Sequence, residues 1–334
     1  MGPAEHPNRE VGSATGAGDM TTRREALLGL GAAASLSLAA GRTSAEAPTP
    51  GAGGLPYRPH SLRTPDGLNI AVQDWGDPSK PAILFIHGFM SSSICWMRQL
   101  SSSLGKDFRL VAYDWRGHGV SDKPNDPRFY AHGARWAQEI ETVISGLKLG
   151  KPVIAGWSMA GEIMCDYLQA RGDSHISGIN FVDTGVLSFP TEGNDAEKRG
   201  GAAAALVSMD TFSSLQATEG FIRLCTATPL APADLAAWVA VGNMTPWYVR
   251  KYMTSRPEPD PRTLLQRLKV PVLITHGGKD LVANIAGARR AATQIPDVRL
   301  RIYEEAGHAS FWDAADAYNA DLGAFAALAH QRPA

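Results

Sequence analysis

Short, uninterrupted apolar runs, each ending in glycine or a polar turn, restrict the possible fold of this chain more than any other feature. Examples are the runs at 81–88 (PAILFIHG), 152–158 (PVIAGWS) and 270–280 (VPVLITHGGKD). Between them, apolar residues recur at helical intervals, as in 129–148 and 159–171. Strands that are apolar on both faces and alternate with helices predict a parallel sheet covered by helices on both sides. The expected fold class is therefore α/β, with an open, mostly parallel, doubly wound sheet.

The remaining patterns extend this alternation and then interrupt it. Further strands are expected at 67–76, 108–119, 176–185 and 298–308, and further helices at 283–294 and 310–329. Residues 186–262 lack strong strand runs and carry alanine-rich, tryptophan-containing helical patterns. Such an insertion between two strands predicts a small helical lid over the carboxyl ends of the sheet, where ligands of this fold class bind.

The beginning of the chain has the layout of an export signal. Arg23 and Arg24 precede an uncharged run from Ala26 to Ala40, and a small-residue cleavage pattern follows at 45–47. The paired arginines resemble the twin-arginine type of signal. The apolar run is shorter than the roughly 20 residues that a membrane-spanning helix needs.

The expected organisation is a disordered leader with this signal at 1–47, a linker at 48–56, and one domain at 57–334 with its lid at about 186–262. The predicted location is the periplasm or the exterior, with the cytoplasm as the alternative if the leader is not a functional signal. Met20 is an alternative start of the chain. No stable membrane insertion is expected after the signal is cleaved, and the sequence does not decide the oligomeric state.

Composition and charge exclude several classes of partner. Hydrophobic residues make up 44% of the 334 residues, which is ample for a globular core. The formal net charge of −1 provides no strong field for nucleic acid, so no nucleic-acid partner is expected. The three cysteines are too few and too scattered for a disulfide framework or a zinc site, and we expect buried free thiols at Cys95, Cys165 and Cys225.

Ser158 lies where a predicted strand turns directly into a predicted helix, in the segment GWSMAG. It is the only serine with glycine or alanine both two residues before and two residues after it, at Gly156 and Ala160. A sharp strand-to-helix turn crowds these two positions and strains the residue between them, which exposes its side chain. The helix N-terminus beneath it favours negative charge. The pattern is weak alone, but its position favours a nucleophile over an ordinary turn.

Two later residues supply the partners that a serine nucleophile needs. Asp280 ends the turn after the strand at 270–277, and His308 follows the last predicted strand, so both emerge at the edge where Ser158 emerges. We expect His308 to accept the Ser158 proton and Asp280 to orient the imidazole. The backbone N–H groups of Met159 and Phe89 are the expected donors to an oxyanion, because Gly88 lets the loop after the strand at 81–86 approach closely.

Five segments together resemble the α/β-hydrolase family, over roughly residues 57–330. They are HGF at 87–89, YDWRGHGVSDKP at 113–124, GWSMAG at 156–161, HGGKD at 276–280 and AGH at 306–308. The resemblance implies a catalytic triad of Ser158, Asp280 and His308 and a reaction without cofactor. It is closest to small esterases and the cofactor-free haloperoxidase or perhydrolase group.

This resemblance comes with two departures. Ala160 replaces the second glycine of the usual turn, and the loop at Phe89-Met90-Ser91 lacks the Trp-Pro typical of the perhydrolase group. The missing proline counts against perhydrolysis as the native activity. A serine nucleophile counts against haloalkane dehalogenases and epoxide hydrolases, which use a carboxylate.

Several other residues have alternative interpretations. Asp183 also ends a predicted strand and is the rival for the triad acid, although the position of Asp280 is the commoner one. His87, His118 and His276 are expected to hold loops, and their spacing supports no metal site. Asp114 is expected to be structural, and Asp313 and Glu304-Glu305 to be surface residues. Trp157, Trp238 and Trp247 are candidates for lining a substrate pocket or for plain packing.

The predicted function is hydrolysis of carboxylic esters or related small carbonyl substrates through an acyl-Ser158 intermediate. The alternatives are a carbon–carbon bond hydrolase with the same triad, a cofactor-free haloperoxidase or perhydrolase, and a non-catalytic binding protein on the same scaffold. The identity of the substrate does not follow from the sequence.

Overall fold

The computed structural model describes Gly2 and residues 56–185, 204–256 and 261–332. Apart from Gly2, the predicted leader lies outside these residues, as do nearly all of the predicted linker and, within the predicted lid, residues 186–203 and 257–260. The described residues from 56 onward make up the folded domain.

An eight-stranded sheet forms the centre of the domain. Its strands are β1 (Arg58–Arg63), β2 (Asn69–Trp75), β3 (Ala82–Ile86), β4 (Arg109–Asp114), β5 (Val153–Trp157), β6 (Gly178–Val182), β7 (Val272–Gly277) and β8 (Val298–Tyr303). Their order in the sheet is β1-β2-β4-β3-β5-β6-β7-β8, and β2 runs antiparallel to both its neighbours while β3 to β8 pair in parallel. The predicted α/β class with a mostly parallel sheet is confirmed.

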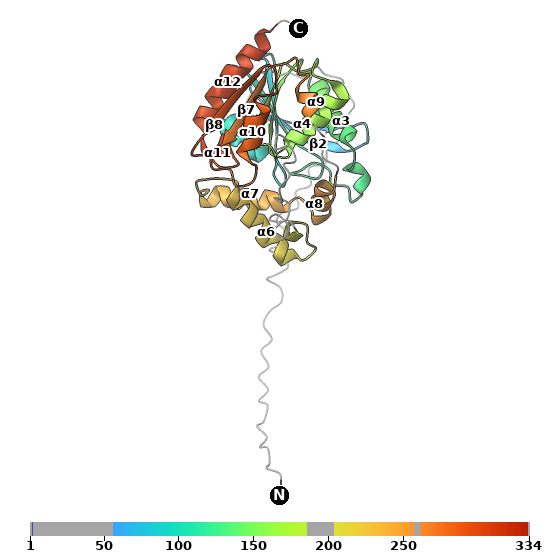
Figure 1. The fold of residues 1–334 in the computed structure, drawn as a ribbon. Helices are drawn as coiled ribbons and strands as arrows, with labels where there is room; N and C mark the ends of the chain where they lie inside the picture. The colour runs from blue at the N-terminus through green and yellow to red at the C-terminus, as the bar shows by residue number, and fades with distance from the viewer. Residues whose placement is uncertain (1, 3–55, 186–203, 257–260, 333–334) are drawn as a thin grey trace, which may run out of the picture. The chain divides into compact units, whose positions relative to one another are not determined.

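Helices cover both faces of the sheet, and each face has its own hydrophobic cluster (Figure 1). One face carries α3 (Gly133–Gly146), α4 (Ala160–Arg171), α9 (Arg262–Leu265) and α10 (Ile285–Ala291). The other carries η1 (Ser93–Trp96), α2 (Met97–Leu100), η2 (Ser103–Lys106), α11 (Ser310–Asp313) and α12 (Ala315–Gln331). In β3, Leu84 and Ile86 belong to the first cluster while Ile83 and Phe85 belong to the second. Side chains that alternate between two buried faces explain why these strands read as continuous apolar runs.

Three of the helices described between β6 and β7 lie wholly within the predicted lid. They are α6 (Thr211–Leu224), α7 (Pro232–Asn243) and α8 (Trp247–Thr254), which lie together beyond one end of the sheet in Figure 1. Asp210 caps α6 by accepting the N–H of Ser213 at 2.8 Å. Buried Arg250 on α8 donates to the Thr218 hydroxyl on α6 at 2.9 Å and to the Gly242 carbonyl on α7 at 2.9 Å. One guanidinium therefore ties the three helices together.

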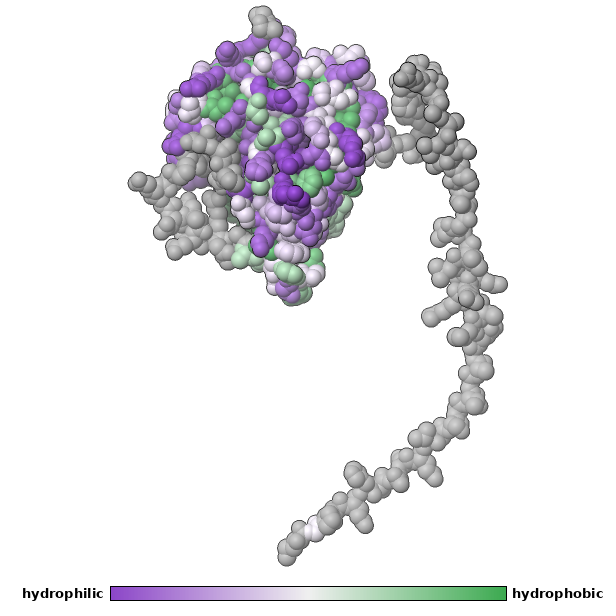
Figure 2. Space-filling model, turned by 90° about the vertical axis from the view of Figure 1, so that its right-hand side faces the viewer, coloured by the Kyte–Doolittle hydropathy of each residue, from purple (hydrophilic) through white to green (hydrophobic). Residues whose placement is uncertain are grey.

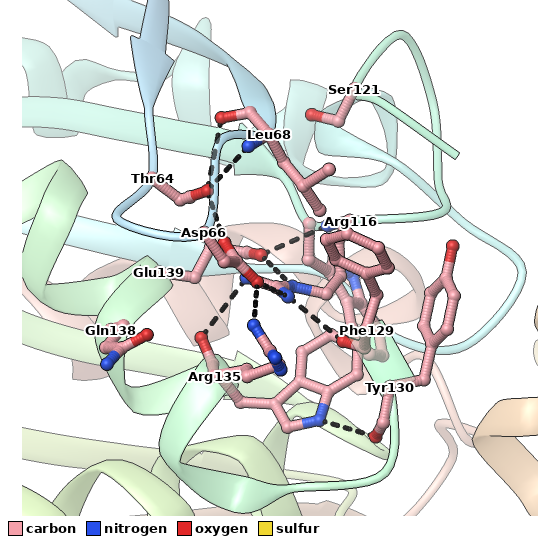
Figure 3. A network of polar contacts seen from close by, with 12 residues as sticks. Thr64, Asp66, Leu68, Arg116, Ser121, Phe129, Tyr130, Arg135, Gln138 and Glu139 are labelled. Carbon is pink, nitrogen blue, oxygen red and sulfur yellow. Dashed lines mark hydrogen bonds and ion pairs between the residues drawn. The ribbon is translucent and has the colours of Figure 1, made fainter. Parts of the chain in front are cut away.

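A cluster of polar side chains lies on the face of the sheet opposite α12 (Figure 3). Its central residue, Arg116, follows β4 and is wholly buried. Its guanidinium donates to Glu139 of α3 at 2.7 Å and to Asp66 at 2.8 Å, and Arg135 also donates to Asp66 at 2.7 Å. Burial alone would raise the pKa of Asp66, but hydrogen bonds from Arg116 and Thr64 outweigh it and lower the pKa to about 2. Asp66 is thus held ionised, and the segment between β1 and β2 is fixed to α3.

The surface is polar over the face in Figure 2, where hydrophilic side chains predominate and apolar side chains form scattered patches. Among the described residues, no helix combines the length and apolar character needed to cross a bilayer.

Candidate active site

The turn from β5 into α4 holds Ser158 in a strained conformation. Its φ is +56°, a region that residues other than glycine seldom occupy. A Cβ on Gly156 would lie 2.8 Å from the Met164 side chain and 3.1 Å from the Cβ of Ala160. The methyl group of Ala160, which is fully buried, is accommodated because Gly156 carries none. The departure from the usual second glycine therefore leaves the turn intact.

Ser158, His308 and Asp280 come together in a continuous hydrogen-bonded chain. Ser158 Oγ lies 2.8 Å from His308 Nε2, and His308 Nδ1 lies 2.9 Å from Asp280 Oδ2. The three residues follow the carboxyl ends of β5, β8 and β7 respectively. With Nδ1–H donating to the carboxylate, Nε2 of the neutral imidazole is the acceptor that faces the serine hydroxyl. This arrangement can remove a proton from Ser158.

Asp280 is fixed as an ionised acceptor. Its Oδ1 accepts the backbone N–H groups of Val282 at 2.7 Å and Ala283 at 2.9 Å. Burial would raise the pKa of Asp280, but hydrogen bonds from His276 and His308 outweigh it and lower the pKa. A carboxylate that stays ionised can hold the imidazole orientation and stabilise the imidazolium once it forms.

His276 lies closer to the site than the sequence interpretation assumed. Its Nε2 is 3.2 Å from Asp280 Oδ2 and 3.2 Å from the Ala283 carbonyl, while its buried Nδ1 has no partner among the described residues. Burial would lower the pKa of His276, but Asp280 and the charge of Asp183 raise it. The four-residue spacing in HGGKD was the one sequence signal for this contact. His276 was expected to hold a loop, and in the structure it also contacts Asp280.

Asp183 lies near Ser158, His308 and Asp280 but is not part of their hydrogen-bonded series. It is fully buried at the end of β6 with φ +47°. Its Oδ1 accepts the N–H of Gly277 at 2.8 Å, and its Oδ2 accepts the N–H and the hydroxyl of Ser310 at 2.9 and 2.7 Å. Burial raises the pKa of Asp183 to about 7, with a further contribution from the charge of Asp280. Asp183 therefore joins the β7 turn to the His308 loop, and Asp280 is the carboxylate bonded to the imidazole.

One group of side chains has the composition of a metal-ligand set. Ligand atoms of Asp183, His276 and Asp280 lie within 4.8 Å of one another. The carboxylate oxygens of both aspartates already accept N–H or O–H groups of the protein. A cation at this position would have to displace those donors.

The loop after β3 lies directly against the nucleophile. A Cβ on Gly88 would be 2.9 Å from the Trp157 ring and 3.2 Å from the Cβ of Ser158. His87, whose pKa burial lowers to about 3, accepts the N–H of Trp115 at 3.2 Å and so anchors the loop as a neutral imidazole. Phe89 follows Gly88, and Met159 is the N-cap of α4. The two predicted oxyanion donors therefore flank Ser158 from different segments.

The candidate pocket tryptophans are placed unequally. Trp157 is only 2% exposed, and its indole N–H donates to the His308 carbonyl at 2.7 Å. Its ring lies 5.9 Å from that of buried Trp238 on α7. Trp247, at the start of α8, packs against Tyr248 at 6.0 Å. Trp157 and Trp238 therefore form a packed junction between the lid and the His308 loop.

Asp313 is a residue that the sequence interpretation missed. Its Oδ2 accepts the N–H of Gly307 at 2.8 Å and that of Ala227 at 2.7 Å, contacts that the expectation of a surface residue did not include. No spacing in the sequence signals these contacts, because Ala227 lies 86 residues away along the chain.

Two surface hollows lie away from Ser158. One, of about 540 Å³, adjoins the amino ends of the parallel strands and includes Lys151, Lys269 and His330 among its lining residues. The other, of about 560 Å³, is formed on α6 around Phe221. Neither includes a residue of the Ser158–His308–Asp280 chain.

Comparison with known proteins identifies the family. Residues 81–315 match the family model described as the alpha/beta hydrolase fold, and the chain belongs to this family. A solved structure of a proposed aryl esterase from Burkholderia cenocepacia is 30% identical, with a TM-score of 0.76 over 82% of this chain and 100% of that one. A non-heme haloperoxidase from Rhodococcus erythropolis is 27% identical over 78% of this chain and 96% of its own. A bifunctional esterase/perhydrolase from Acinetobacter calcoaceticus is 26% identical over 79% of this chain and 98% of its own.

Proposed function

We propose that the protein is a serine hydrolase that cleaves carboxylic esters or related small carbonyl substrates through an acyl-Ser158 intermediate. The observation that carries this proposal is the chain of contacts at 2.8 Å and 2.9 Å from Ser158 through His308 to Asp280. The esterase names of several relatives support the same substrate class.

The proposed reaction has two halves. Ser158 Oγ attacks the ester carbonyl carbon while His308 Nε2 takes its proton, and the backbone N–H groups of Phe89 and Met159 stabilise the resulting oxyanion. The intermediate collapses, the bond to the alcohol breaks, and His308 returns the proton to the leaving oxygen. Water then gives a proton to His308 and attacks the acyl carbon, which releases the acid and restores the Ser158 hydroxyl.

Labelling with a fluorophosphonate tests the nucleophile directly. We expect one adduct per chain, mapped to Ser158 by mass spectrometry, and turnover of p-nitrophenyl acetate by the wild type. Ser158→Ala should lose both while keeping the thermal unfolding midpoint, because only a partly exposed hydroxyl is removed. Retention of most of the activity in this variant would exclude the mechanism.

Perhydrolysis or halogenation is the second candidate, because relatives carry haloperoxidase and perhydrolase names. One observation counts against it. Met90 in the loop after the oxyanion donor has φ +54°, which a proline ring cannot adopt because it holds φ near −65°. The loop therefore differs in backbone from one that carries Trp-Pro at this place. Peroxide-dependent bromination in acetate buffer, at a rate exceeding ester hydrolysis, would reverse this preference.

Two further alternatives differ in substrate or in catalysis. A carbon–carbon bond hydrolase would use the same three residues on a diketone, so a panel of diketones and p-nitrophenyl esters of increasing chain length separates the two activities. A binding protein on this scaffold would show neither turnover nor labelling of Ser158.

Export is the proposed location, on the basis of the sequence of residues 1–47. Expression with a carboxyl-terminal tag followed by cell fractionation tests it. Arg23→Lys with Arg24→Lys should retain the protein in the cytoplasm if the twin-arginine route is used.

A further inference from the structure

Asp313 connects the lid to the loop that carries His308. It ends α11, and a single carboxylate oxygen accepts two backbone N–H groups, from Gly307 at 2.8 Å and from Ala227 at 2.7 Å. Gly307 directly precedes His308, and Ala227 lies three residues after the end of α6. Hydrogen bonds to an ionised acceptor are roughly twice as strong as those between neutral groups. The carboxylate thus joins two segments that share no other side-chain bridge of this kind in the described structure.

Direct contacts between the same two segments surround this bridge. The N–H of Ala309 donates to the Cys225 carbonyl at 2.6 Å. A Cβ on Gly307 would lie 2.6 Å from the nitrogen of Ala227 and 2.9 Å from the carbonyl carbon of Thr226, so the two backbones are in close contact. The residues on both sides of His308 are therefore held by residues 225–227.

The carbonyl of His308 itself is held by a residue of β5 on which the lid packs. It accepts the indole N–H of Trp157 at 2.7 Å, and Trp238 of α7 packs on the Trp157 ring at a centroid distance of 5.9 Å. Trp238 in turn meets the Trp312 ring edge-on at 5.0 Å, next to Asp313 in the chain. The backbone at 307–309 thus has partners at three successive residues, and each leads to the lid or to a residue packed on it.

We infer that Asp313 is a positioning residue that sets the distance between His308 and Ser158 by fixing the His308 loop to the docked lid. This inference rests on the proposed serine hydrolase function. His308 must stay within hydrogen-bond reach of Ser158, and catalytic groups tolerate displacements of only about 0.5 Å. Without the carboxylate, the N–H groups of Gly307 and Ala227 lose their acceptor, and the His308 loop is held less tightly on the side that precedes His308.

Asp313→Ala and Asp210→Ala form a matched pair of variants that tests the inference. Both remove an aspartate that accepts N–H groups of the lid, but Asp210 caps the opposite end of α6 and bonds only within that segment. We expect Asp313→Ala to lower kcat for p-nitrophenyl acetate and the rate of fluorophosphonate labelling by roughly 10- to 100-fold, with KM changed less than about 3-fold. Asp210→Ala should keep both rates within about 3-fold of wild type.

A spectroscopic measurement reads the position of His308 without depending on turnover. The downfield proton NMR signal of the His308–Asp280 hydrogen bond should shift or broaden in Asp313→Ala and stay unchanged in Asp210→Ala. Asp313→Asn keeps the shape and one acceptor oxygen, so an intermediate effect is expected, and this variant decides the matter if Asp313→Ala does not fold by circular dichroism.

The outcomes separate the inference from the proposed function. Wild-type labelling rates and an unchanged proton signal in Asp313→Ala would overturn the positioning role. Equal losses in Asp313→Ala and Asp210→Ala would also overturn it, because general loosening of the lid would then explain both. Absence of labelling in the wild type would reject the hydrolase mechanism, whereas the proton signal would still decide whether Asp313 positions His308.

Discussion

Two clusters of charged side chains each contain two carboxylates but differ in their basic residues. The arginine cluster, between the β1–β2 turn and α3, consists of Asp66, Arg116, Arg135 and Glu139. The histidine cluster, at the carboxyl ends of β6, β7 and β8, consists of Asp183, His276, Asp280 and His308. Each therefore pairs two acids with two basic side chains, and in the arginine cluster Arg116 and Glu139 are buried while Asp66 and Arg135 are partly exposed.

The type of basic side chain determines whether a cluster can only stabilise the fold or can also transfer a proton. A guanidinium does not lose its proton in proteins, so the arginine cluster can only hold elements together. An imidazole changes charge near neutral pH, so the histidine cluster can accept and return a proton. Only the histidine cluster adjoins a hydroxyl in a strained turn, at Ser158. The comparison predicts that changes at the base in the histidine cluster mainly affect the rate of turnover, whereas changes in the arginine cluster mainly affect the stability of the fold.

The largest expected effect comes from removing the base. His308→Gln should lower kcat for p-nitrophenyl acetate by about 10⁴-fold or more, since the serine then has no proton acceptor. The thermal unfolding midpoint should stay within a few degrees of wild type. A loss of less than 100-fold would show that another group in the histidine cluster acts as base.

Removing the central arginine, Arg116, should lower stability and leave kcat nearly unchanged. Arg116→Met leaves Glu139 buried without its partner, and breaking such a pair typically costs about 3–5 kcal/mol in the free energy of unfolding. Urea denaturation measures this loss. The kcat of the remaining folded protein should match wild type within a few-fold, and a large loss of kcat without a loss of stability would contradict the division of roles.

The two clusters should also respond differently to pH. Asp183 has a native pKa of about 7, above the ordinary 3.8, so the native state holds a proton that the unfolded chain has lost. Its stabilising contribution is present below pH 3.8 and is lost as the pH rises through about 7. The raised pKa of His276 acts in the same direction above pH 6.5.

Asp66 has the opposite shift, to about 2, so its contribution is complete above pH 3.8 and is lost only as the pH falls toward 2. Urea denaturation at pH 5, 6, 7 and 8 therefore distinguishes the clusters. Asp183→Asn should flatten the decline in stability between pH 5 and pH 7, whereas Asp66→Asn should keep the wild-type slope. Equal slopes in all three proteins would show that Asp183 is ionised throughout this range.

The turn beside the histidine cluster gives the smallest expected change. Ala160→Gly removes a methyl group that already fits, so kcat should change less than about 2-fold. Because glycine is unfavourable in a helix, the free energy of unfolding should fall by about 0.5–1 kcal/mol. A clear gain in kcat would show that the methyl group strains Ser158.

The sequence predicted the buried strands well because their physics is local. The runs at β3, β5 and β7 are apolar on both faces, and the structure places strands there with ends shifted by only a few residues. Strand β1 was not predicted because every second side chain of RPHSLR is exposed at the sheet edge. The helix expected at 310–329 is divided at Ala314, whose φ of −116° and ψ of 43° separate α11 from α12.

The sequence predicted those site residues whose positions directly after predicted strands place them at one edge of the sheet. Ser158, Asp280 and His308 follow the carboxyl ends of β5, β7 and β8, so an edge common to all three was expected. The contact of His276 with Asp280 and the bridge of Asp313 depend on how loops approach in space. The spacing in HGGKD permits the contact of His276 with Asp280 but does not specify it. Side chains such as Asp313 that bind backbone N–H groups leave no pattern in the residues that they bind, so both roles required the structure.

The separation of the site residues along the chain also has a consequence for when the proposed site can form. Ser158 is 150 residues away from His308 in the chain, and Asp183 is 127 residues away from Ser310. Contacts over such separations close late in folding and make it slow. Ribosomes add about 5–20 residues per second, so a growing chain carries Ser158 for about 8 to 30 seconds before His308 is synthesised. The contact between Ser158 and His308 therefore forms only after β8 has joined the sheet, and a chain that stops short of this strand carries the proposed nucleophile without the proposed base.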